Sequence, residues 1–343
     1  MTSNSQQPFT EFSLSRLDAF LRDTLPGTCG EMQLERIGGG QSNPTFFINY
    51  ANRQMVLRKK PAGEILPSAH AVDREYRVIT ALANSDVPVP KALLFHGDDD
   101  VVGTPFYVME RLHGRVFSDY QLAQAPAGDR WTMYQSMAHT LASLHKVDID
   151  AVGLSDFGRN GNYFSRQLNR WGNQWEAAEQ AHNPYITPLL HWLRAHVPAD
   201  TTTRLCHGDF RMGNLMFHPT EPRVIGVLDW ELSTLGHPLA DLAYNCIAWE
   251  TLPEEYGGLR GLDLSALGIA ELPQYLALYY QQVPEQGMAE PFHFAFALFR
   301  LAVIFEGIAA RARLGTAASA NASDVSHLGT AFARRGLALL DLL

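Results

Sequence analysis

Residues 205–230, LCHGDFRMGNLMFHPTEPRVIGVLDW, contain two aspartates, Asp209 and Asp229, and an asparagine, Asn214, beside short apolar runs. An ionised carboxylate next to a hydrophobic core costs free energy unless a cation or partner compensates it. Asp209 and Asn214 are separated by four residues that include a glycine, which is typical of a loop. A hairpin of the two apolar runs would bring this loop close to Asp229. Mg²⁺ prefers carboxylate and amide oxygens, so the stretch predicts a magnesium site that binds phosphates.

Other groups that phosphoryl transfer requires occur upstream. A glycine-rich turn, IGGGQSN at residues 37–43, allows backbone N–H groups to approach phosphates closely. Arg58 follows Val56 on the same face of a predicted strand, so it can place a cation on the α- and β-phosphates. Glu75, early in the next predicted helix, can pair with that cation. Five residues of the turn are candidate phosphate contacts: Gly38, Gly39, Gly40, Gln41 and Ser42.

Strand patterns and one helix occupy the first third of the chain. Residues 46–50 and 54–59 flank a short turn and predict a hairpin, and residues 91–97 and 104–112 predict a second one. Between the hairpins, apolar residues recur at helical spacing over residues 72–83. This part of the chain is therefore predicted to be a sheet with one helix.

Helical patterns dominate after Gly114, and only the two short apolar runs at 214–217 and 224–228 interrupt them. A chain of 343 residues is too long for a single comfortable core. We predict an α+β fold with two lobes and a cleft between them. The small β-rich lobe spans residues 1–112, and the large, mainly helical lobe spans residues 113–343.

The order of these parts is that of the protein kinase fold: glycine-rich turn, cationic strand residue, helical glutamate, hairpin, helices, HxDx4N and a distal aspartate. The sequence resembles the aminoglycoside phosphotransferase/choline kinase-like family of the protein kinase superfamily. HGDFRMGN at 207–214 is similar to the HGDxxxxN catalytic loop of that family, and VLDWE at 227–231 to the segment with its metal-binding aspartate. The resemblance covers nearly the whole chain and is weakest over the first thirty residues and over 160–200.

Three further segments resemble one branch of the family. They are VLRKKPAG at 56–63, DWELSTLGHPLADLAY at 229–244 and RLAVIFEGIAARARLG at 300–315. Within the family they are most similar to the kinase-like domain that is joined to acyl-CoA dehydrogenases in some animal proteins. The resemblance therefore implies a functional link to an acyl-CoA dehydrogenase.

The resemblance implies a role for each matching residue. Asp209 would orient and deprotonate the acceptor hydroxyl, and Asn214 and Asp229 would bind Mg²⁺. His207 would hold the catalytic loop. Arg211 would contact the γ-phosphate or an anionic acceptor. Three residues of an interlobe hinge would contact the adenine: Met109, Glu110 and Leu112.

Two further positions follow from the same resemblance. Asp241 would buttress the catalytic loop from the following helix. Arg58 stands where most kinases have lysine, although the choline kinase side of the family also uses arginine. Because arginine can pair bidentately with phosphate and with Glu75, we expect activity to survive this departure.

These residues predict a kinase that uses ATP and Mg²⁺ and phosphorylates a small-molecule hydroxyl, such as that of a hydroxy acid or hydroxyacyl-CoA. An aminoglycoside acceptor is an alternative, because acidic pockets bind cations, although Arg211 would repel it. A nucleotide-binding pseudokinase is a second alternative, although such proteins typically lack the base or a metal ligand. A remote alternative is an iron(II) oxygenase, with His207, Asp209 and either His218 or His237 as ligands. Those enzymes are β-rich, whereas this chain has a helical second half.

Composition limits the partners. A net charge of −9 and a pI of about 5.8 argue against nucleic-acid binding. Three cysteines without close pairing indicate reduced thiols, and the N-terminus lacks the pattern of a signal peptide. Charged residues interrupt the apolar stretch 291–310, which favours a buried helix over a membrane span. We expect a cytoplasmic protein that binds neither nucleic acid nor membrane.

Overall fold

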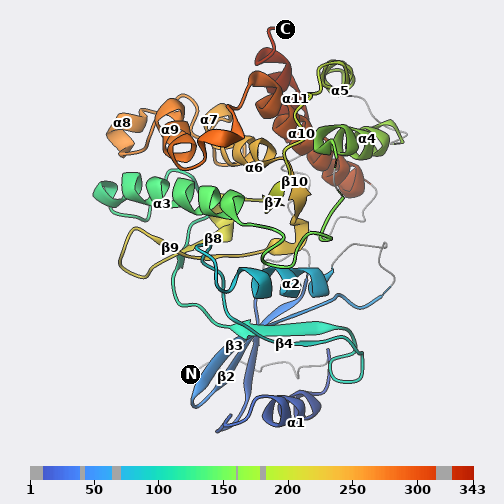
Figure 1. Cartoon of the computed structure of the whole chain (residues 1–343), viewed down its shortest axis with the longest axis vertical. Coiled ribbons are helices and arrows are strands. Elements are labelled where there is room, and N and C mark those ends of the chain that lie inside the picture. The colour runs from blue at the N-terminus through green and yellow to red at the C-terminus, as the bar shows by residue number, and fades with distance from the viewer. Residues whose placement is uncertain (1–10, 39–42, 64–70, 160, 178–182, 314–326) are drawn as a thin grey trace. The chain divides into compact units, whose positions relative to one another are not determined.

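The computed structural model describes residues 11–38, 43–63, 71–159, 161–177, 183–313 and 327–343. The chain forms two compact units, each with its own interior (Figure 1). The first comprises Met1–Ala83 and Pro90–Leu112, and the second comprises Asn84–Val89 and His113–Leu343. Residues 84–89 thus group with the second unit, where the backbone oxygen of Pro88 accepts a hydrogen bond from Val227 N at 2.8 Å.

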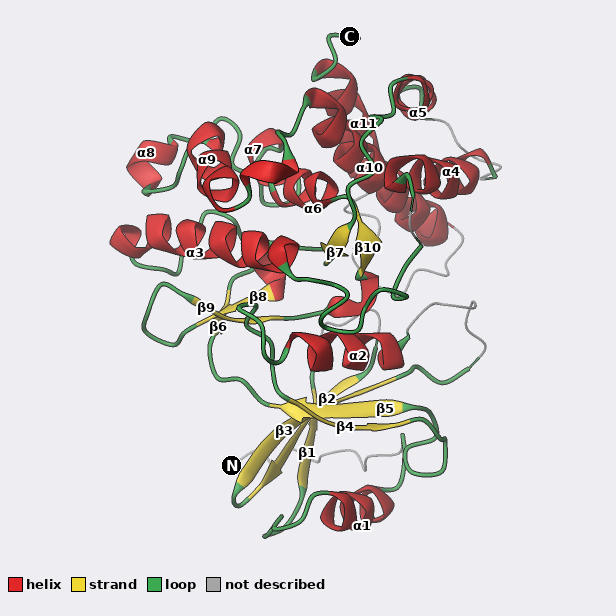
Figure 2. Cartoon of the chain, in the orientation of Figure 1, coloured by secondary structure: helices red, strands yellow, loops and turns green. Residues whose placement is uncertain are grey.

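The first unit is built on an antiparallel sheet of strand order β1-β2-β3-β5-β4 (Figure 2). Both predicted hairpins are confirmed, as β2–β3 and β4–β5. Helix α1 and strand β1 were not among the predicted elements. The described elements are α1 (Leu14–Thr24), β1 (Gln33–Arg36), β2 (Thr45–Tyr50), β3 (Arg53–Lys59), α2 (Val72–Leu82), β4 (Ala92–His96) and β5 (Phe106–Glu110).

Alternation along β3 places Arg58 on the face of the sheet that α2 covers. Met55 and Leu57 are fully buried in an apolar cluster with side chains of α1. Because successive strand residues point to opposite faces, Val56 and Arg58 point toward α2. Figure 2 shows α1 and α2 on opposite faces of this sheet. The period of two in the sequence therefore directs the cation toward the helix that carries Glu75.

The second unit is mainly helical, with two small sheets of order β6-β8-β9 and β10-β7. The two predicted short strands are confirmed as the antiparallel pair β8 and β9. Its strands are β6 (Arg115–Val116), β7 (Arg204–Cys206), β8 (Leu215–Phe217), β9 (Val224–Val227) and β10 (Thr234–Gly236). Its helices are α3 (Ala127–Lys146), α4 (Tyr163–Glu176), α5 (Ile186–Ala195), α6 (Pro238–Asn245), α7 (Ile247–Glu250), α8 (Leu264–Leu267), α9 (Leu272–Gln282), α10 (Pro291–Arg313) and α11 (Leu328–Ala338). Short 3₁₀ turns are η1 (Met212–Asn214), η2 (Trp230–Leu232) and η3 (Pro284–Gln286).

Helix α10 lies at the centre of the helical packing, against α5, α6 and α11. By length and composition it is the one described helix that could cross a membrane, and 78% of its most apolar window is buried inside the protein. A buried core helix of a globular unit can have the same length and apolar composition. The predicted burial of this segment is confirmed.

Candidate active site

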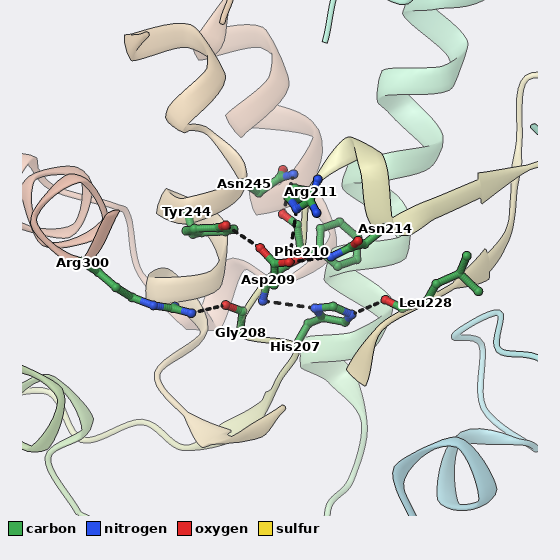
Figure 3. A network of polar contacts seen from close by, with 10 residues as sticks. All are labelled: His207, Gly208, Asp209, Phe210, Arg211, Asn214, Leu228, Tyr244, Asn245 and Arg300. Carbon is green, nitrogen blue, oxygen red and sulfur yellow. Dashed lines mark hydrogen bonds and ion pairs between the residues drawn. The ribbon is translucent and has the colours of Figure 1, made fainter. Parts of the chain in front are cut away.

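The β8–β9 hairpin brings the two halves of the opening motif together in the second unit. Leu228, just after β9, donates its backbone N–H to the backbone carbonyl oxygen of Asn214 at 2.8 Å. The backbone oxygen of Leu228 accepts a hydrogen bond from His207 Nε2 at 2.9 Å (Figure 3). The other ring nitrogen, Nδ1, accepts from the backbone N–H of Asp209 at 3.2 Å. His207 therefore ties the 207–214 loop to the residue before Asp229.

Three side chains donate hydrogen bonds to the carboxylate of Asp209 (Figure 3). Asn214 Nδ2 lies 2.7 Å from Oδ2, and Arg211 Nε lies 3.2 Å from the same oxygen. Tyr244, on α6, donates its hydroxyl to Oδ1. Burial, together with the negative charge of Asp209, raises the pKa of Tyr244 well above its usual value, so the phenol keeps the proton that it donates. These donors fix the orientation of the Asp209 carboxylate.

Tyr244 was not among the predicted site residues. It belongs to the quoted segment PLADLAY and lies three residues after Asp241, so both side chains lie on one side of α6. Helical spacing from Asp241 is thus the signal that could have identified it. Arg211 was among the predicted site residues, and its guanidinium lies beside the Asp209 carboxylate. Burial by itself lowers the pKa of Arg211, but neighbouring Tyr256 and Asp209 raise it above the usual value, so the side chain stays charged.

Asp241, which was expected to support the loop that carries Asp209, holds the start of that loop. Its carboxylate accepts hydrogen bonds from the backbone N–H groups of His207 at 2.5 Å and Gly208 at 2.8 Å. Gly208 has a φ of 83°, and an added Cβ would lie 2.4 Å from the oxygen of Leu232, so this turn requires glycine. Burial by itself raises the pKa of Asp241, but His145 and the Gly208 amide lower it below the usual value.

The depressed pKa of Asp241 makes stability depend on pH in a defined window. Its ordinary pKa is 3.8, and the folded value is lower, so the unfolded chain binds the proton more readily. The stability from this carboxylate is present above that ordinary pKa and is lost as pH falls through the folded value. Between about pH 5 and about pH 3, we expect the wild type to lose more unfolding free energy than Asp241→Asn does. Urea unfolding followed by tryptophan fluorescence measures this difference.

The control for this experiment is Asp263→Asn, an exposed N-cap residue of α8. The unfolding free energy of this control variant should depend on pH as that of the wild type does. If Asp241→Asn lost as much unfolding free energy on acidification as the wild type, the conclusion that Asp241 is charged and stabilises the loop would be wrong.

Asn214 and Asp229 have the chemistry of hard-oxygen ligands. The amide nitrogen of Asn214 donates to the Asp209 side chain and to the Asp209 backbone oxygen, at 2.7 and 2.9 Å. No residue that the structure describes donates to the amide oxygen of Asn214, which leaves that oxygen for a cation. Asp229 has φ 65° and ψ 64°, a left-handed conformation that is uncommon outside glycine and is concentrated at functional sites. These two residues fit a Mg²⁺ ion.

In the first unit, Glu75 is the centre of a second polar cluster. Glu75 is fully buried, and its Oε2 lies 3.2 Å from Arg58 Nε, so the predicted ion pair is present. Tyr107 donates its hydroxyl to Oε2 at 3.0 Å, and Asn43 Nδ2 lies 2.5 Å from Oε1. Sequence analysis identified neither Tyr107 nor Asn43. Tyr107 pairs with Arg58 across the β3–β5 ladder, so strand register is what places it there.

The other predicted nucleotide contacts lie on β3, at or just after β5, and in the glycine-rich turn before β2. Val56 and Met109 are both buried and are direct cross-strand partners. Glu110 ends β5, and its side chain accepts a hydrogen bond from the backbone N–H of Lys91 at 2.9 Å. Leu112 is the last residue of the first unit. Of the five predicted contacts in the glycine-rich turn, only Gly38 is described, whereas Gly39, Gly40, Gln41 and Ser42 lie outside the described residues.

The ligand set of the iron(II) oxygenase alternative does not come together. His218 lies 3.6 Å from Glu221, and His237 lies 3.1 Å from Asp200. Within the described residues, neither histidine joins Asp209 in a group of three ligands close enough for one metal ion. The structure therefore provides no support for a facial triad.

Comparison with known proteins agrees with this arrangement. A model of the phosphotransferase enzyme family matches residues 33–278. The chain belongs to this family. The predicted resemblance is thereby confirmed.

Curated relatives carry the name of another enzyme. Acyl-CoA dehydrogenase family member 10 of Mus musculus is 43% identical over 318 residues, which cover 91% of this chain and 30% of that protein. Family member 11 of Homo sapiens is 36% identical over 342 residues, which cover 97% of this chain and 44% of that protein. The chain thus spans less than half the length of these relatives.

Solved structures share the fold. A crystal structure from Ralstonia eutropha, provisionally named an aminoglycoside phosphotransferase, has a TM-score of 0.88 at 41% identity and covers 96% of this chain and 98% of that one. An aminoglycoside phosphotransferase crystallised with AMP-PNP and hygromycin B has a TM-score of 0.62 at 15% identity, covering 94% and 99%. The predicted α+β kinase-like class, with a β-rich N-terminal region and a helical C-terminal region, is confirmed. Family and fold together support a small-molecule kinase.

Proposed function

We propose that this protein is a Mg²⁺- and ATP-dependent kinase that phosphorylates the hydroxyl of a small hydroxy acid or its CoA thioester. The observation that carries the proposal is the Asp209 carboxylate, which Asn214, Arg211 and Tyr244 orient on a loop that Asp241 holds. A carboxylate so oriented can accept the proton of an acceptor hydroxyl. Without such a base, the family membership alone would be compatible with a nucleotide-binding pseudokinase.

The reaction follows from the roles of these residues. The acceptor O–H proton passes to Asp209, the acceptor oxygen bonds to the γ-phosphorus, and the bond from that phosphorus to the β–γ bridging oxygen breaks, so that ADP leaves. Arg58, held by Glu75, places positive charge on the α- and β-phosphates. Asn214 and Asp229 would hold a Mg²⁺ ion, which would supply positive charge to neutralise the phosphates.

The charge beside the base supports an acidic acceptor. Arg211 stays protonated and lies within hydrogen-bond distance of Asp209, so a polycationic aminoglycoside would meet repulsion there. The names of the relatives support a link to acyl-CoA metabolism, with an acyl-CoA dehydrogenase as a functional partner. A net charge of −9 argues against nucleic acid, and three free cysteines suit a reducing compartment such as the cytoplasm.

An aminoglycoside acceptor is the second candidate, because the printed names of solved neighbours favour it. The deciding experiment measures ADP release with hydroxy acids, hydroxyacyl-CoA thioesters and kanamycin-type sugars, and identifies the phosphorylated product by mass spectrometry. We expect turnover of hydroxy acids or their thioesters. Turnover of aminoglycosides alone would overturn the proposed acceptor, and ATP-dependent thermal stabilisation without any turnover would favour a pseudokinase.

Asp229→Asn tests the metal site. Even changes in groups behind a metal ligand cost about 10–100-fold in metal affinity, so loss of this charged ligand should raise the Mg²⁺ concentration for half-maximal ADP production at least about tenfold. Initial rates at fixed ATP and varied Mg²⁺ give this value. The matched control is Glu221→Gln, an exposed residue in the turn of the same β8–β9 hairpin, for which no change is expected. An unchanged Mg²⁺ requirement in Asp229→Asn would place the metal elsewhere.

A further inference from the structure

A buried arginine without a carboxylate partner lies beside the catalytic loop. Arg300, on α10, is only 8% exposed. Its Nη2 donates to the backbone oxygen of Gly208 at 2.6 Å, so the guanidinium contacts the residue directly before the base Asp209 (Figure 3). Among the residues that the structure describes, no aspartate or glutamate lies within ion-pair distance of it, and its buried Nε has no hydrogen-bond partner.

Burying the Arg300 guanidinium costs free energy, because a charge removed from water is stabilised only when it is paired. Two aromatic rings compensate it in part, because the guanidinium carbon lies 5.3 Å from the ring centre of Tyr244 and 5.9 Å from that of Trp171. These cation–π contacts and one backbone hydrogen bond are not an ion pair, so within the described part of the chain the charge of Arg300 has no counterion. The guanidinium of Arg300 therefore has the charge to bind an anion.

Arg300 is linked to the base through Gly208 and Tyr244. Arg211 donates to Oδ2 of Asp209, whereas Tyr244 donates to Oδ1 and also contacts Arg300 through its ring. Arg211 thus contacts the base directly, whereas Arg300 contacts the residue before it and the tyrosine that donates to it. In a protein of net charge −9, this local pair of cations contrasts with the rest of the molecule.

We propose that Arg300 binds a carboxylate of the acceptor and, with Arg211, makes the site selective for acidic acceptors. The planar guanidinium suits a carboxylate, because its N–H groups match the two oxygens. This inference rests on the proposed kinase function and adds to it the residue that selects the acceptor. A role limited to holding Gly208 would affect all acceptors alike, whereas carboxylate binding affects acidic acceptors more.

The experiment compares two acceptors of the same length on the full chain. One is a short hydroxy carboxylate, and the other is the diol in which a hydroxymethyl group replaces the carboxylate. The ratio of their kcat/KM values, from ADP release, should fall about 10–100-fold in Arg300→Gln, because a hydrogen bond to a charged group is lost. Arg300→Lys, which keeps the charge and loses the planar fork, should recover part of the ratio.

Arg170→Gln is the matched control. Arg170 is exposed, and its guanidinium carbon lies 5.2 Å from the ring centre of Trp171, the ring that Arg300 also contacts. Its acid-to-diol ratio should equal that of the wild type. Equal losses for acid and diol in Arg300→Gln, or no loss, would overturn the inference and leave the kinase function in place.

A binding measurement separates this inference from the kinase proposal. Calorimetry with Mg²⁺ and AMP-PNP records the affinity for a deoxy acid, which carries the carboxylate and lacks the reacting hydroxyl. Arg300→Gln should weaken this binding about 10–100-fold. This binding measurement does not depend on turnover. If the wild type phosphorylated neither acceptor, the kinase proposal would fail, and the carboxylate site could still be confirmed by binding. Equal affinity in the wild type and Arg300→Gln, or no binding by either, would overturn the carboxylate site.

Discussion

Asp209→Asn is expected to reduce kcat for ADP production by about 10²- to 10⁴-fold, because an amide cannot accept the proton of the acceptor hydroxyl. The substitution preserves the shape of the side chain and retains an oxygen that can accept a hydrogen bond. Folding and nucleotide binding should therefore persist. The measurement combines steady-state ADP release with thermal stabilisation by Mg²⁺ and AMP-PNP.

The control is Asp98→Asn, an exposed loop residue of the first unit, which should behave as the wild type in both assays. Full turnover by Asp209→Asn would show that this carboxylate is not the base. Loss of nucleotide stabilisation together with turnover would assign Asp209 to nucleotide binding and leave the acceptor proton to pass to solvent.

Glu75→Ala should destabilise the first unit by about 3–5 kcal/mol, the range for removing one partner of a buried ion pair. The side chains of Arg58 and Glu75 are 12% and 1% exposed, so solvent screens this pair little. The substitution also removes the acceptor of the hydrogen bonds from Tyr107 and Asn43.

The location of the tryptophans makes this prediction specific to one unit. All six lie between residues 131 and 249, in the second unit, so their fluorescence does not follow unfolding of the first unit. We expect amide hydrogen exchange to accelerate in β3, β5 and α2 of Glu75→Ala, while the tryptophan unfolding transition stays unchanged.

The control is Asp73→Ala, which removes an exposed charge from the first turn of the same helix. It should cost only about 0.3–1 kcal/mol, through the helix dipole. Equal exchange rates in Asp73→Ala and Glu75→Ala would show that the buried ion pair does not stabilise the unit.

Local sequence patterns predicted much of the fold. The period of two in residues 46–59 gave the β2–β3 hairpin and the face of Arg58, and the polar turn after residue 217 gave the β8–β9 pair. These elements are recoverable because strand partners are close in sequence and alternation assigns their faces. Helix α1 and strand β1 were missed, although a serine N-cap and buried leucines at helical spacing mark α1.

The candidate site was predictable only where one segment supplies both partners. Asp209, Arg211 and Asn214 contact one another within a short loop, so their spacing was informative. The tyrosine hydroxyl on Asp209 comes from 35 residues away, and the arginine on the Gly208 backbone comes from 92 residues away. The hydrophobic periodicity of a sequence cannot predict contacts between residues so far apart.

The sequence by itself therefore determined which reactive groups the chain has, the order in which they occur, and the strands and helices that carry them. The tertiary structure decided how the Asp209 carboxylate is oriented and which side chains of distant segments lie beside it. The physical reason is that hydrogen bonds and buried charges act over a few ångströms, whereas the path of the chain between Gly208 and Arg300 depends on the packing of the whole helical unit.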